Sequence, residues 1–539
     1  MTAKSVETLF AGQDYTLSLT DADAASKGST KGSADDSLEG NTAQQLAIQD
    51  IAYRSDAVRP GSIFFCVVGA KSDGHHFAAD AAARGAVALA VQHPVAVDLP
   101  QVTLANTRLS LALSSSALFD QPSRSLSVVG ITGTNGKTTT SYLVDWILRQ
   151  AFKTTGEKTG LIGTVETRIG STVLPSEHTT PESYDLQKLL SRMQRSGLTH
   201  VTMEVSSHAI ALDRVAGTEF AVVAFSNLTQ DHLDFHPDME SYFNAKAKLF
   251  ASPLARARVI DIDGSYGARL AQRCTEAGHK VLTCGFATQA AVRATQVSYR
   301  ADATQLTVLT PQGEISFSYP LIGSFNVSNV LLALAISLEL GLSLPGIVQA
   351  LEQVPQIPGR LERVLPTGAG AHLPVKLFVD YAHTPDSISK ALAALAAIRT
   401  GRMGIVFGCG GDRDASKRPL MGAAARAADF AVVTSDNPRS EDPLAIIADI
   451  LPGMAGFEEH YTVEPDRRRA IACALAQAAP GDFILLAGKG HEDYQLVGQE
   501  KLTFDDRVVA AQEMDRLATQ ASFAHPSAQA TLVGGGPCV

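Results

Sequence analysis

Residues 125–141 read SLSVVGITGTNGKTTTS, and this stretch decides the fold. The apolar run is typical of a buried strand, and the threonine-rich segment after the lysine is expected to begin a helix. Between them lies a glycine-rich loop whose backbone N–H groups, with the helix N-terminus, can cradle phosphate oxygens. Lys137 would neutralise the β- and γ-phosphates, and Thr138 supplies the hydroxyl that P-loop proteins use on Mg²⁺.

The loop is a variant of the phosphate-loop pattern GxxxxGK[ST]. That pattern requires glycine at position 131, where this sequence has Ile131; the glycines are Gly130, Gly133 and Gly136. GKTTT after an apolar strand nevertheless favours ATP binding over an incidental lysine in a turn. The motif alone leaves GTPase switches, motor-like ATPases and kinases open.

Strand and helix patterns alternate on both sides of the loop and predict an α/β protein of three domains. A central domain at residues 126–356 would hold a mostly parallel sheet around the P-loop. A Rossmann-like C-terminal domain at 357–522 is indicated by VKLFVDYAH, GRMGIVFGCGG, FAVVTSD and DFILLAGKG, because each apolar run ends in a polar or glycine-rich loop. An N-terminal domain at 1–125 has a βαβ rhythm, with a mobile low-complexity insertion at 20–44, and residues 523–539 are expected to be a flexible tail.

Composition narrows the class of protein. The net charge of −10 argues against general nucleic-acid binding, which needs clustered Lys and Arg. The six cysteines are scattered without metal-like spacing, which indicates reduced thiols in a cytoplasmic protein. No apolar stretch has the length of a signal peptide or a membrane span, so no membrane partner is expected.

Further motifs make the chain resemble the Mur ligase family over about residues 50–510. Besides GTNGKTTT, the matching blocks are HTTPE, MEVSSHAIALDR, NLTQDHLDFH, YFNAKAKLF, GSFNVSNV, PGRLERV, VDYAHTPD, GGDRD and GKGHEDYQ. The resemblance implies an ATP-dependent ligase of peptidoglycan synthesis. A carboxylate would attack the γ-phosphate of ATP to form an acyl phosphate, and an amine would then displace phosphate. Two polyanions must meet in the first step, so charge neutralisation should dominate catalysis.

Within the family, DNPR at residues 436–439 and the form of the N-terminal domain imply that meso-2,6-diaminopimelate is added to the D-Glu γ-carboxylate of UDP-N-acetylmuramoyl-L-alanyl-D-glutamate. ATP and these two compounds are the expected substrates, and the chain is expected to be a monomer. For the amino acid, Arg439 would grip the distal carboxylate through two parallel bonds. The positions that match the family's amino-acid site are Arg413, Asp436, Asn437, Pro438, Arg439, Gly488 and Glu492.

The resemblance also implies a catalytic and metal-binding group. Its catalytic members are Lys137, Glu204, His232 and Lys246, and its Mg²⁺ ligands are Thr138, Glu204, His232 and Lys246. Lys246 matches the lysine that the family carries as a carbamate, which converts a cation into an anion that can hold Mg²⁺. From spacing alone, Lys246 and Lys248 would instead lie on a solvated helix face.

The remaining family positions concern the two nucleotides. For the UDP-sugar peptide they are Ser55, Thr179, Thr180, Ser206 and Arg214; the family's Asp-Ser-Arg is Arg54-Ser55-Asp56 here, so only Ser55 transfers. For ATP they are Gly133, Thr134, Asn135, Gly136, Lys137, Thr138, Thr139, Asn326, Asn329, Arg360, Asp380 and His383.

The sequence leaves two other enzymes and one protein without ligase activity as alternatives. A ligase of the same family could add L-lysine, or the chain could resemble folylpolyglutamate synthetase. The 125 residues before the phosphate loop argue against the folate enzyme, and Arg439 argues against the L-lysine enzyme. A P-loop nucleotide switch without ligation chemistry is less favoured, because it needs neither a carbamate lysine nor a third α/β domain.

Overall fold

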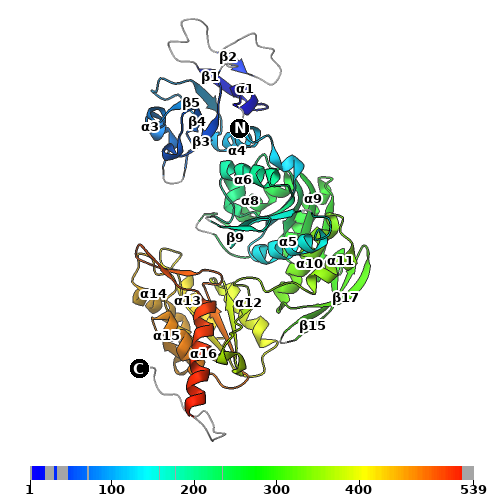
Figure 1. The fold of residues 1–539 in the computed structure, drawn as a ribbon, viewed down its shortest axis with the longest axis vertical. Coiled ribbons are helices and arrows are strands. Elements are labelled where there is room, and N and C mark those ends of the chain that lie inside the picture. The colour runs from blue at the N-terminus through cyan, green and yellow to red at the C-terminus, as the bar shows by residue number, and fades with distance from the viewer. Residues whose placement is uncertain are drawn as a thin grey trace. The chain divides into compact units, whose positions relative to one another are not determined.

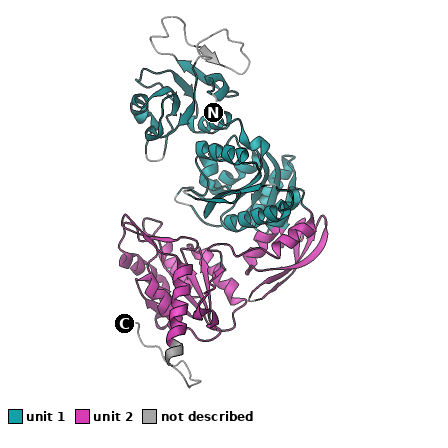
Figure 2. Ribbon diagram, viewed as in Figure 1, with its two compact units in different colours: residues 1–284, 332–342 teal, residues 285–331, 343–539 magenta. Residues whose placement is uncertain are grey.

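The computed structural model describes residues 3–18, 30–32, 46–69, 72–156, 158–176, 178–232, 235–300 and 302–524. The chain forms two compact units, one of residues 1–284 with 332–342 and the other of 285–331 with 343–539 (Figure 2). The α/β class is confirmed, with a parallel-rich sheet in each of three domains (Figure 1). The boundaries predicted at 125/126 and 356/357 stay predictions.

The first sheet belongs to the N-terminal domain. Its strands, in spatial order, are β2 (Thr30–Gly32), β1 (Tyr15–Ser18), β6 (Gln101–Leu104), β5 (Ala86–Val91), β4 (Ser62–Phe65) and β3 (Asp50–Ala52). Strands β3 to β6 are parallel, and β1 runs antiparallel to β6 and β2. Its helices are α1 (Val6–Leu9), α3 (Ala78–Ala83) and α4 (Thr107–Leu118), with 3-10 turns at Ser55–Ala57 and Gly74–Phe77. The all-buried strand β4 explains why SIFF reads as an unbroken apolar run.

Two predicted flexible segments fall mostly outside the described residues. Within the insertion expected at 20–44, the structure describes only β2, which pairs with β1. The helix α16 (Asp506–Ala524) continues two residues past 522, where the tail was predicted to begin, and the rest of the tail lies outside the described residues.

The second sheet carries the phosphate loop, and the part that holds this loop lies, like the first sheet, in the unit of residues 1–284 with 332–342. The strands of this sheet that belong to the first unit are, in spatial order, β10 (Thr172–Pro175), β9 (Glu166–Ile169), β8 (Lys158–Ile162), β11 (Leu198–Glu204), β7 (Ser127–Thr132), β12 (Phe220–Phe225), β13 (Ala255–Asp261) and β14 (Val281–Gly285). From β8 to β14 the neighbours are parallel, and β9 and β10 form an antiparallel hairpin. The helices are α5 (Lys137–Ala151), α6 (Ser183–Arg195), α7 (Ser207–Ala211), α8 (Met239–Ala251) and α9 (Ser265–Glu276).

Strand order places three functional segments at one edge of this sheet. Strand β7 lies between β11 and β12, and all three are parallel. Their carboxyl ends are therefore neighbours, which is where ligands of open α/β sheets bind. Close packing of β7 requires Gly130, because a Cβ there would lie 2.7 Å from the Phe220 ring.

The second unit contains three antiparallel strands and the C-terminal α/β domain. The antiparallel strands are β15 (Val292–Tyr299), β16 (Thr304–Thr310) and β17 (Gly313–Tyr319), and helices α10 (Ser324–Glu339) and α11 (Leu344–Leu351) follow them. The C-terminal sheet has the order β18 (Glu362–Arg363), β19 (Lys376–Asp380), β23 (Phe483–Ala487), β20 (Met403–Phe407), β21 (Phe430–Val433) and β22 (Tyr461–Val463). All its neighbours after β18 are parallel.

Helices cover both faces of the C-terminal sheet, as expected for a Rossmann-like domain. One core cluster joins the strands to α12 (Pro385–Ala396), α13 (Lys417–Ala425) and α14 (Pro443–Ile450), and a second joins them to α15 (Arg467–Gln477) and α16. A small hairpin, β24 (Tyr494–Val497) with β25 (Glu500–Thr503), extends from the loop after β23.

Two expectations drawn from composition concern the described residues. Five cysteines are described, and each is buried and outside any disulfide, so they act as packing residues; Cys538 lies outside this range. Among the described helices, none combines the length and the apolar character that a membrane crossing requires.

Candidate active site

The phosphate loop connects β7 to α5 through two glycines in unusual conformations. Gly133 has φ 153° and Gly136 has φ 84°, in the range that favours glycine. A Cβ on Gly133 would lie 1.9 Å from the Ser226 hydroxyl, so no other residue fits there. Ile131 is a buried residue of β7, which still continues at this point. The missing glycine at position 131 is thus explained, because the loop begins only after Thr132.

Lys137 is the first residue of α5 and lies back over the loop. Its ammonium donates hydrogen bonds to the carbonyl oxygens of Gly133 and Thr134, both at 2.9 Å. The positive end of the α5 dipole adds to this charge at the same point. A cation and a helix N-terminus together make a site for phosphate oxygens.

The segment after β12 supports the loop. Asn227 accepts the Thr134 N–H through its backbone carbonyl and the Asn135 N–H through its side-chain oxygen, both at 2.9 Å. Thr229 N–H donates to the Thr134 hydroxyl at 3.0 Å. The motif NLTQDH was expected to contribute only His232, so the sequence analysis missed Asn227 and Thr229. Their position directly after an apolar strand was the available signal.

Glu204 ends β11 with a fully buried side chain. Its carboxylate accepts bonds from the Thr138 hydroxyl at 3.0 Å, the Thr164 hydroxyl at 3.0 Å and the Thr164 N–H at 2.8 Å. Gly163 makes room for this group, since a Cβ there would lie 2.6 Å from the carboxylate. The predicted pair Thr138 and Glu204 is therefore in direct contact. Thr164 is a further member that no motif singled out.

Lys246 lies on α8 and is 1% exposed, whereas Lys248 on the same helix is exposed. The solvated helix face expected from spacing alone is therefore wrong for Lys246. Its nitrogen donates to the Gly133 carbonyl at 3.0 Å and lies 4.6 Å from the centre of the Tyr242 ring. Burial, with a smaller effect from the charge of Lys137, holds the pKa of Lys246 well below its ordinary value.

His232 follows β12 in a left-handed conformation, with φ 55°. Burial lowers its pKa to about 4, although the charge of Asp231 opposes this. The imidazole is therefore neutral near pH 7, which is the form that binds metals. Its ring lies 6.2 Å from that of Tyr242, whose hydroxyl is 3.2 Å from the Thr134 hydroxyl.

The residues expected to contact the muramoyl peptide lie around the same edge. The Thr180 hydroxyl donates to the Glu204 carbonyl at 2.9 Å and accepts the Ser206 N–H at 3.0 Å. Arg214 donates to the Thr180 carbonyl at 3.1 Å. Thr179 and Thr164 hydroxyls are 3.1 Å apart. The structure thus brings these four predicted residues together beside the phosphate loop.

Ser55, the remaining predicted contact of the UDP-sugar, lines a cavity of about 300 Å³ in the first unit. Arg54 and Asp56, which flank it, also line the cavity and form an exposed ion pair of 2.6 Å. Tyr53, Arg108 and Glu182 are among the other lining residues. The lining combines aromatic, hydroxyl and charged groups, and its two arginines are paired with the carboxylates of Asp56 and Glu182.

The positions expected to hold the ATP base and ribose belong to the second unit. Asn326 and Asn329 are buried, and the Asn329 amide nitrogen donates a hydrogen bond of 3.1 Å to Asn326 Oδ1. Arg360 lies 5.0 Å from the centre of the Tyr381 ring, and His383 Nδ1 is 2.8 Å from the Tyr381 carbonyl. Asp380 accepts the Leu361 N–H at 2.7 Å, and burial raises its pKa to about 6.

The predicted amino-acid site gathers at the carboxyl edge of the C-terminal sheet. Asn437 donates to the Glu492 carboxylate at 2.8 Å. Gly488 meets Asp436 so closely that a Cβ would lie 2.4 Å from the carboxylate. Arg439 follows Pro438 and donates to the Gly411 carbonyl at 2.6 Å. Both arginines lie close to Gly410. A Cβ on that glycine would be 3.0 Å from the Arg439 guanidinium and 3.8 Å from Arg413 Cγ.

Lys489 is a buried cation of this site that the sequence analysis did not single out. Its side chain is fully buried, and its nitrogen lies 3.5 Å from both Asn437 Oδ1 and Glu492 Oε2. It also donates to the Tyr494 carbonyl. The lysine of GKG after an apolar strand was the signal that could have identified it.

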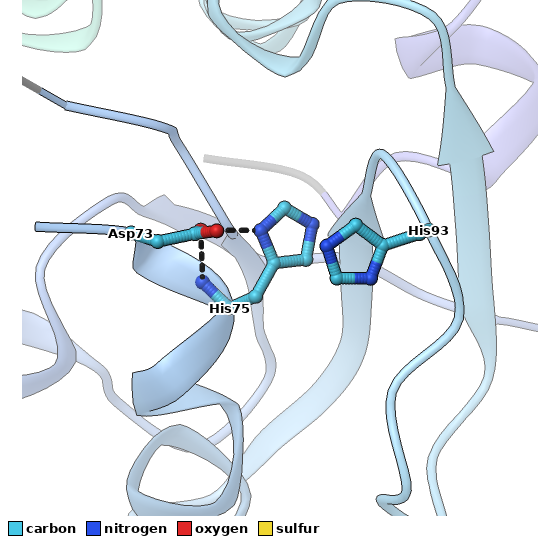
Figure 3. Close-up of side chains that lie close together, drawn as sticks. All are labelled: Asp73, His75 and His93. Carbon is cyan, nitrogen blue, oxygen red and sulfur yellow. Dashed lines mark hydrogen bonds and ion pairs between the residues drawn. The ribbon is translucent and has the colours of Figure 1, made fainter.

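Away from these residues, Asp73, His75 and His93 form a cluster with metal-ligand chemistry (Figure 3). The Asp73 carboxylate accepts two hydrogen bonds from His75, one from the backbone N–H at 2.9 Å and one from the ring Nδ1–H at 2.6 Å. The other ring nitrogen of His75 accepts the Gln92 N–H at 2.9 Å. Both nitrogens are therefore engaged, and the cluster ties the loop before α3 to the end of β5.

Comparison with known proteins shows similarity along most of the chain. Family models described as "Mur ligase family, catalytic domain", "Mur ligase middle domain" and "Mur ligase, glutamate ligase domain" match residues 47–119, 131–337 and 359–490. The chain is 44% identical over 461 residues to UDP-N-acetylmuramoyl-L-alanyl-D-glutamate--2,6-diaminopimelate ligase of Geobacillus thermodenitrificans, covering 84% of this chain and 92% of that protein.

Solved structures agree with this similarity. A structure of UDP-N-acetylmuramoyl-L-alanyl-D-glutamate--2,6-diaminopimelate ligase matches with 30% identity and a TM-score of 0.65, covering 89% of this chain and 97% of that one. Folylpolyglutamate synthase of Mycobacterium tuberculosis, complexed with ADP and AMPPCP, matches with 19% identity and a TM-score of 0.56, covering 76% and 95%. The second likeness extends to the fold alone.

Proposed function

The chain belongs to the Mur ligase family, and on that premise we infer that it adds 2,6-diaminopimelate to UDP-N-acetylmuramoyl-L-alanyl-D-glutamate in peptidoglycan synthesis. One observation carries this inference: the 44% identity to a ligase of that name extends over 84% of the chain. The meso stereoisomer is part of the proposal. It rests on the Asp436 to Arg439 segment, where a cation and carboxylates lie together and can hold the distal carboxylate and ammonium of the amino acid.

We assign the first chemical step to the edge of the second sheet. An oxygen of the D-Glu γ-carboxylate attacks the γ-phosphorus of ATP, the bond to the β,γ-bridging oxygen breaks, and ADP leaves. Lys137 and the N-terminus of α5 would stabilise the negative charge that gathers on the phosphate oxygens. In the second step, the neutral amino group attacks the acyl carbon, the bond from that carbon to the phosphate oxygen breaks, and the nitrogen releases a proton as the amide forms and phosphate leaves.

The residues at this edge fit Mg²⁺, which prefers oxygen ligands. The Thr138 hydroxyl and the buried Glu204 carboxylate are bonded to each other, and Thr164 orients the carboxylate. The neutral His232 would be a further ligand. When bound, Mg²⁺ would neutralise charge on the phosphate oxygens.

A carbamate on Lys246 is supported by the state of its amine. Carbon dioxide reacts only with a neutral amine, and burial lowers the pKa of Lys246 well below its ordinary value. The product is an anion beside Gly133 and so beside the phosphate loop, where it would hold Mg²⁺.

ADP release tests the proposed function directly. Purified protein is given ATP and Mg²⁺, with or without UDP-N-acetylmuramoyl-L-alanyl-D-glutamate, and with meso-diaminopimelate, L-lysine, L-glutamate or no amino acid. We expect rapid ADP release with meso-diaminopimelate and slow release with L-lysine. Efficient use of L-lysine would overturn the assignment of diaminopimelate as the amino acid that is added. ADP release without any nucleotide sugar would indicate a nucleotide switch instead.

Two further expectations follow from the substrates. Both ATP and nucleotide sugars are cytoplasmic metabolites, so we place the reaction in the cytoplasm. We also propose a monomer, which light scattering of the purified protein would check.

A further inference from the structure

The segment Asp436, Asn437, Pro438 and Arg439 runs alongside strand β24, which lies almost sixty residues later in the chain. Three hydrogen bonds join the segment to β24, and a fourth joins it to Gly498, the residue directly after the strand. Gln495 Nε2 donates to the Asp436 carbonyl at 2.6 Å, and Leu496 N–H donates to Asn437 Oδ1 at 2.9 Å. Arg439 N–H donates to the Leu496 carbonyl at 3.0 Å, and Gly498 N–H donates to the Arg439 carbonyl at 2.7 Å.

These bonds hold Arg439 in a conformation that it would not adopt by itself. Its φ of 51° lies in the left-handed region, which costs a residue with a Cβ of order 1 kcal/mol or more. The Arg439 N–H is bonded to Leu496 of β24 and the Arg439 carbonyl to Gly498, the residue after the strand, so these two bonds offset the cost. The direction of the guanidinium, which donates to the Gly411 carbonyl at 2.6 Å, depends on that backbone conformation.

A buried cation connects the same strand to the rest of the site. Lys489 donates to the carbonyl of Tyr494, the first residue of β24, and lies 3.5 Å from Asn437 Oδ1 and Glu492 Oε2. Its charge offsets the desolvation of Glu492, whose pKa is raised by burial and then by Asp436. Lys489 therefore links β24, the loop after β23 and the loop after β21.

We propose that β24 is a template for amino-acid selection, and that Gln495 and Lys489 are positioning residues that act through Arg439, Asn437 and Glu492. This inference rests on the proposed function. L-lysine lacks the carboxylate that Arg439 would bind. A displaced Arg439 should therefore weaken binding of diaminopimelate more than binding of L-lysine.

Gln495→Leu is the central variant, because it removes the donor to Asp436 and keeps a side chain of similar size. Gln499→Leu is the matched control, since Gln499 is an exposed residue of the turn in the same hairpin. One hydrogen bond of this kind changes an equilibrium by about two- to ten-fold. We expect Gln495→Leu to raise the KM for meso-diaminopimelate by about that factor, with the KM values for ATP and the nucleotide sugar unchanged.

The ratio of kcat/KM for meso-diaminopimelate to kcat/KM for L-lysine should fall by a similar factor in Gln495→Leu and stay at the wild-type value in Gln499→Leu. Lys489→Met should lower the same ratio, and Lys489→Arg should restore part of it. A role in folding alone would lower the temperature of unfolding and reduce activity with both amino acids equally, and that result would overturn the inference.

Hydrogen–deuterium exchange of the wild-type protein keeps the test independent of any variant that fails to fold. A preformed template predicts slow exchange of the Arg439 and Leu496 amides before any amino acid is added. Rapid exchange of both amides in the free protein would overturn the template. Inactivity of the wild type with meso-diaminopimelate would count against the proposed function itself. The exchange rates of the two amides can still be measured in that case, because the measurement does not require activity.

Discussion

The side-chain nitrogen of Lys246 donates a hydrogen bond of 3.0 Å to the carbonyl oxygen of Gly133. This contact joins α8 to the phosphate loop across more than one hundred residues of chain. A buried lysine with a lowered pKa is thereby held where the phosphates of ATP are expected. The same position is suited to a carbamate, and it leads to the first prediction.

Lys246→Ala should be nearly inactive in ADP release, because it removes the group that would carry the carbamate. Short-chain carboxylic acids should restore part of the activity by supplying the lost anion. Lys248→Ala on the exposed face of the same helix is the control and should retain wild-type activity. An unmodified Lys246 in a well-resolved substrate complex would contradict the prediction.

Lys137→Ala should abolish formation of the acyl phosphate. Lys137 is the cation that lies over the loop, and loss of one such group costs at least about 100-fold in kcat. ADP release with all substrates present measures the effect. Lys153→Ala, at an exposed position just after α5, controls for a general loss of charge. Wild-type rates of ADP release in Lys137→Ala would show that ATP does not bind at this loop.

Thr164→Val should weaken the binding of Mg²⁺, so that the enzyme needs a higher Mg²⁺ concentration for activity. The hydroxyl orients Glu204, and groups that orient a metal ligand are worth about 10- to 100-fold in affinity or activity. We expect the Mg²⁺ concentration for half-maximal activity to rise by at least about 10-fold. Thr172→Val, exposed on β10, should leave the titration unchanged; an identical titration for Thr164→Val would exclude the role assigned to Thr164.

Arg439→Ala should raise the KM for meso-diaminopimelate by at least about ten-fold and change the KM for ATP little. A charged hydrogen bond contributes roughly 1.5–3 kcal/mol, and more when its loss leaves a buried charge unpaired. Steady-state kinetics with L-lysine as a competing amine measures both values. Arg426→Ala, exposed at the end of α13, is the control, and an unaffected Arg439→Ala would reassign the distal carboxylate to another residue.

Asp506→Asn should destabilise the C-terminal domain by about 3 kcal/mol or more, because it leaves Arg467 buried without its counter-charge. Both side chains of this pair are fully buried and lie 2.6 Å apart. Arg467 also donates to the Ala487 carbonyl at the end of β23. Denaturant unfolding measures the change, with the exposed Asp493→Asn as control; equal stability of the two variants would contradict the role of the pair.

The sequence by itself determined the α/β class, the phosphate loop and the strands of the C-terminal sheet. Each of these is encoded locally: a buried parallel strand needs an unbroken apolar run, and β7, β20 and β23 have one. A glycine after such a run also allows a loop conformation that other residues avoid, such as the φ of 84° at Gly136. The family motifs then named residues such as Thr138 and Glu204, which the structure joins by a hydrogen bond.

Only the tertiary structure decided which side chains are buried and what they contact. Spacing along α8 does not show that Lys246 faces the phosphate loop, because that depends on how α8 packs against β13 and the strand ends. No role was predicted for Asn227, Thr164 and Lys489, because their roles come from partners distant in the chain. The pairing of Arg439 with β24 is of the same kind, since hydrogen bonds between remote backbone segments leave no periodic pattern in the sequence.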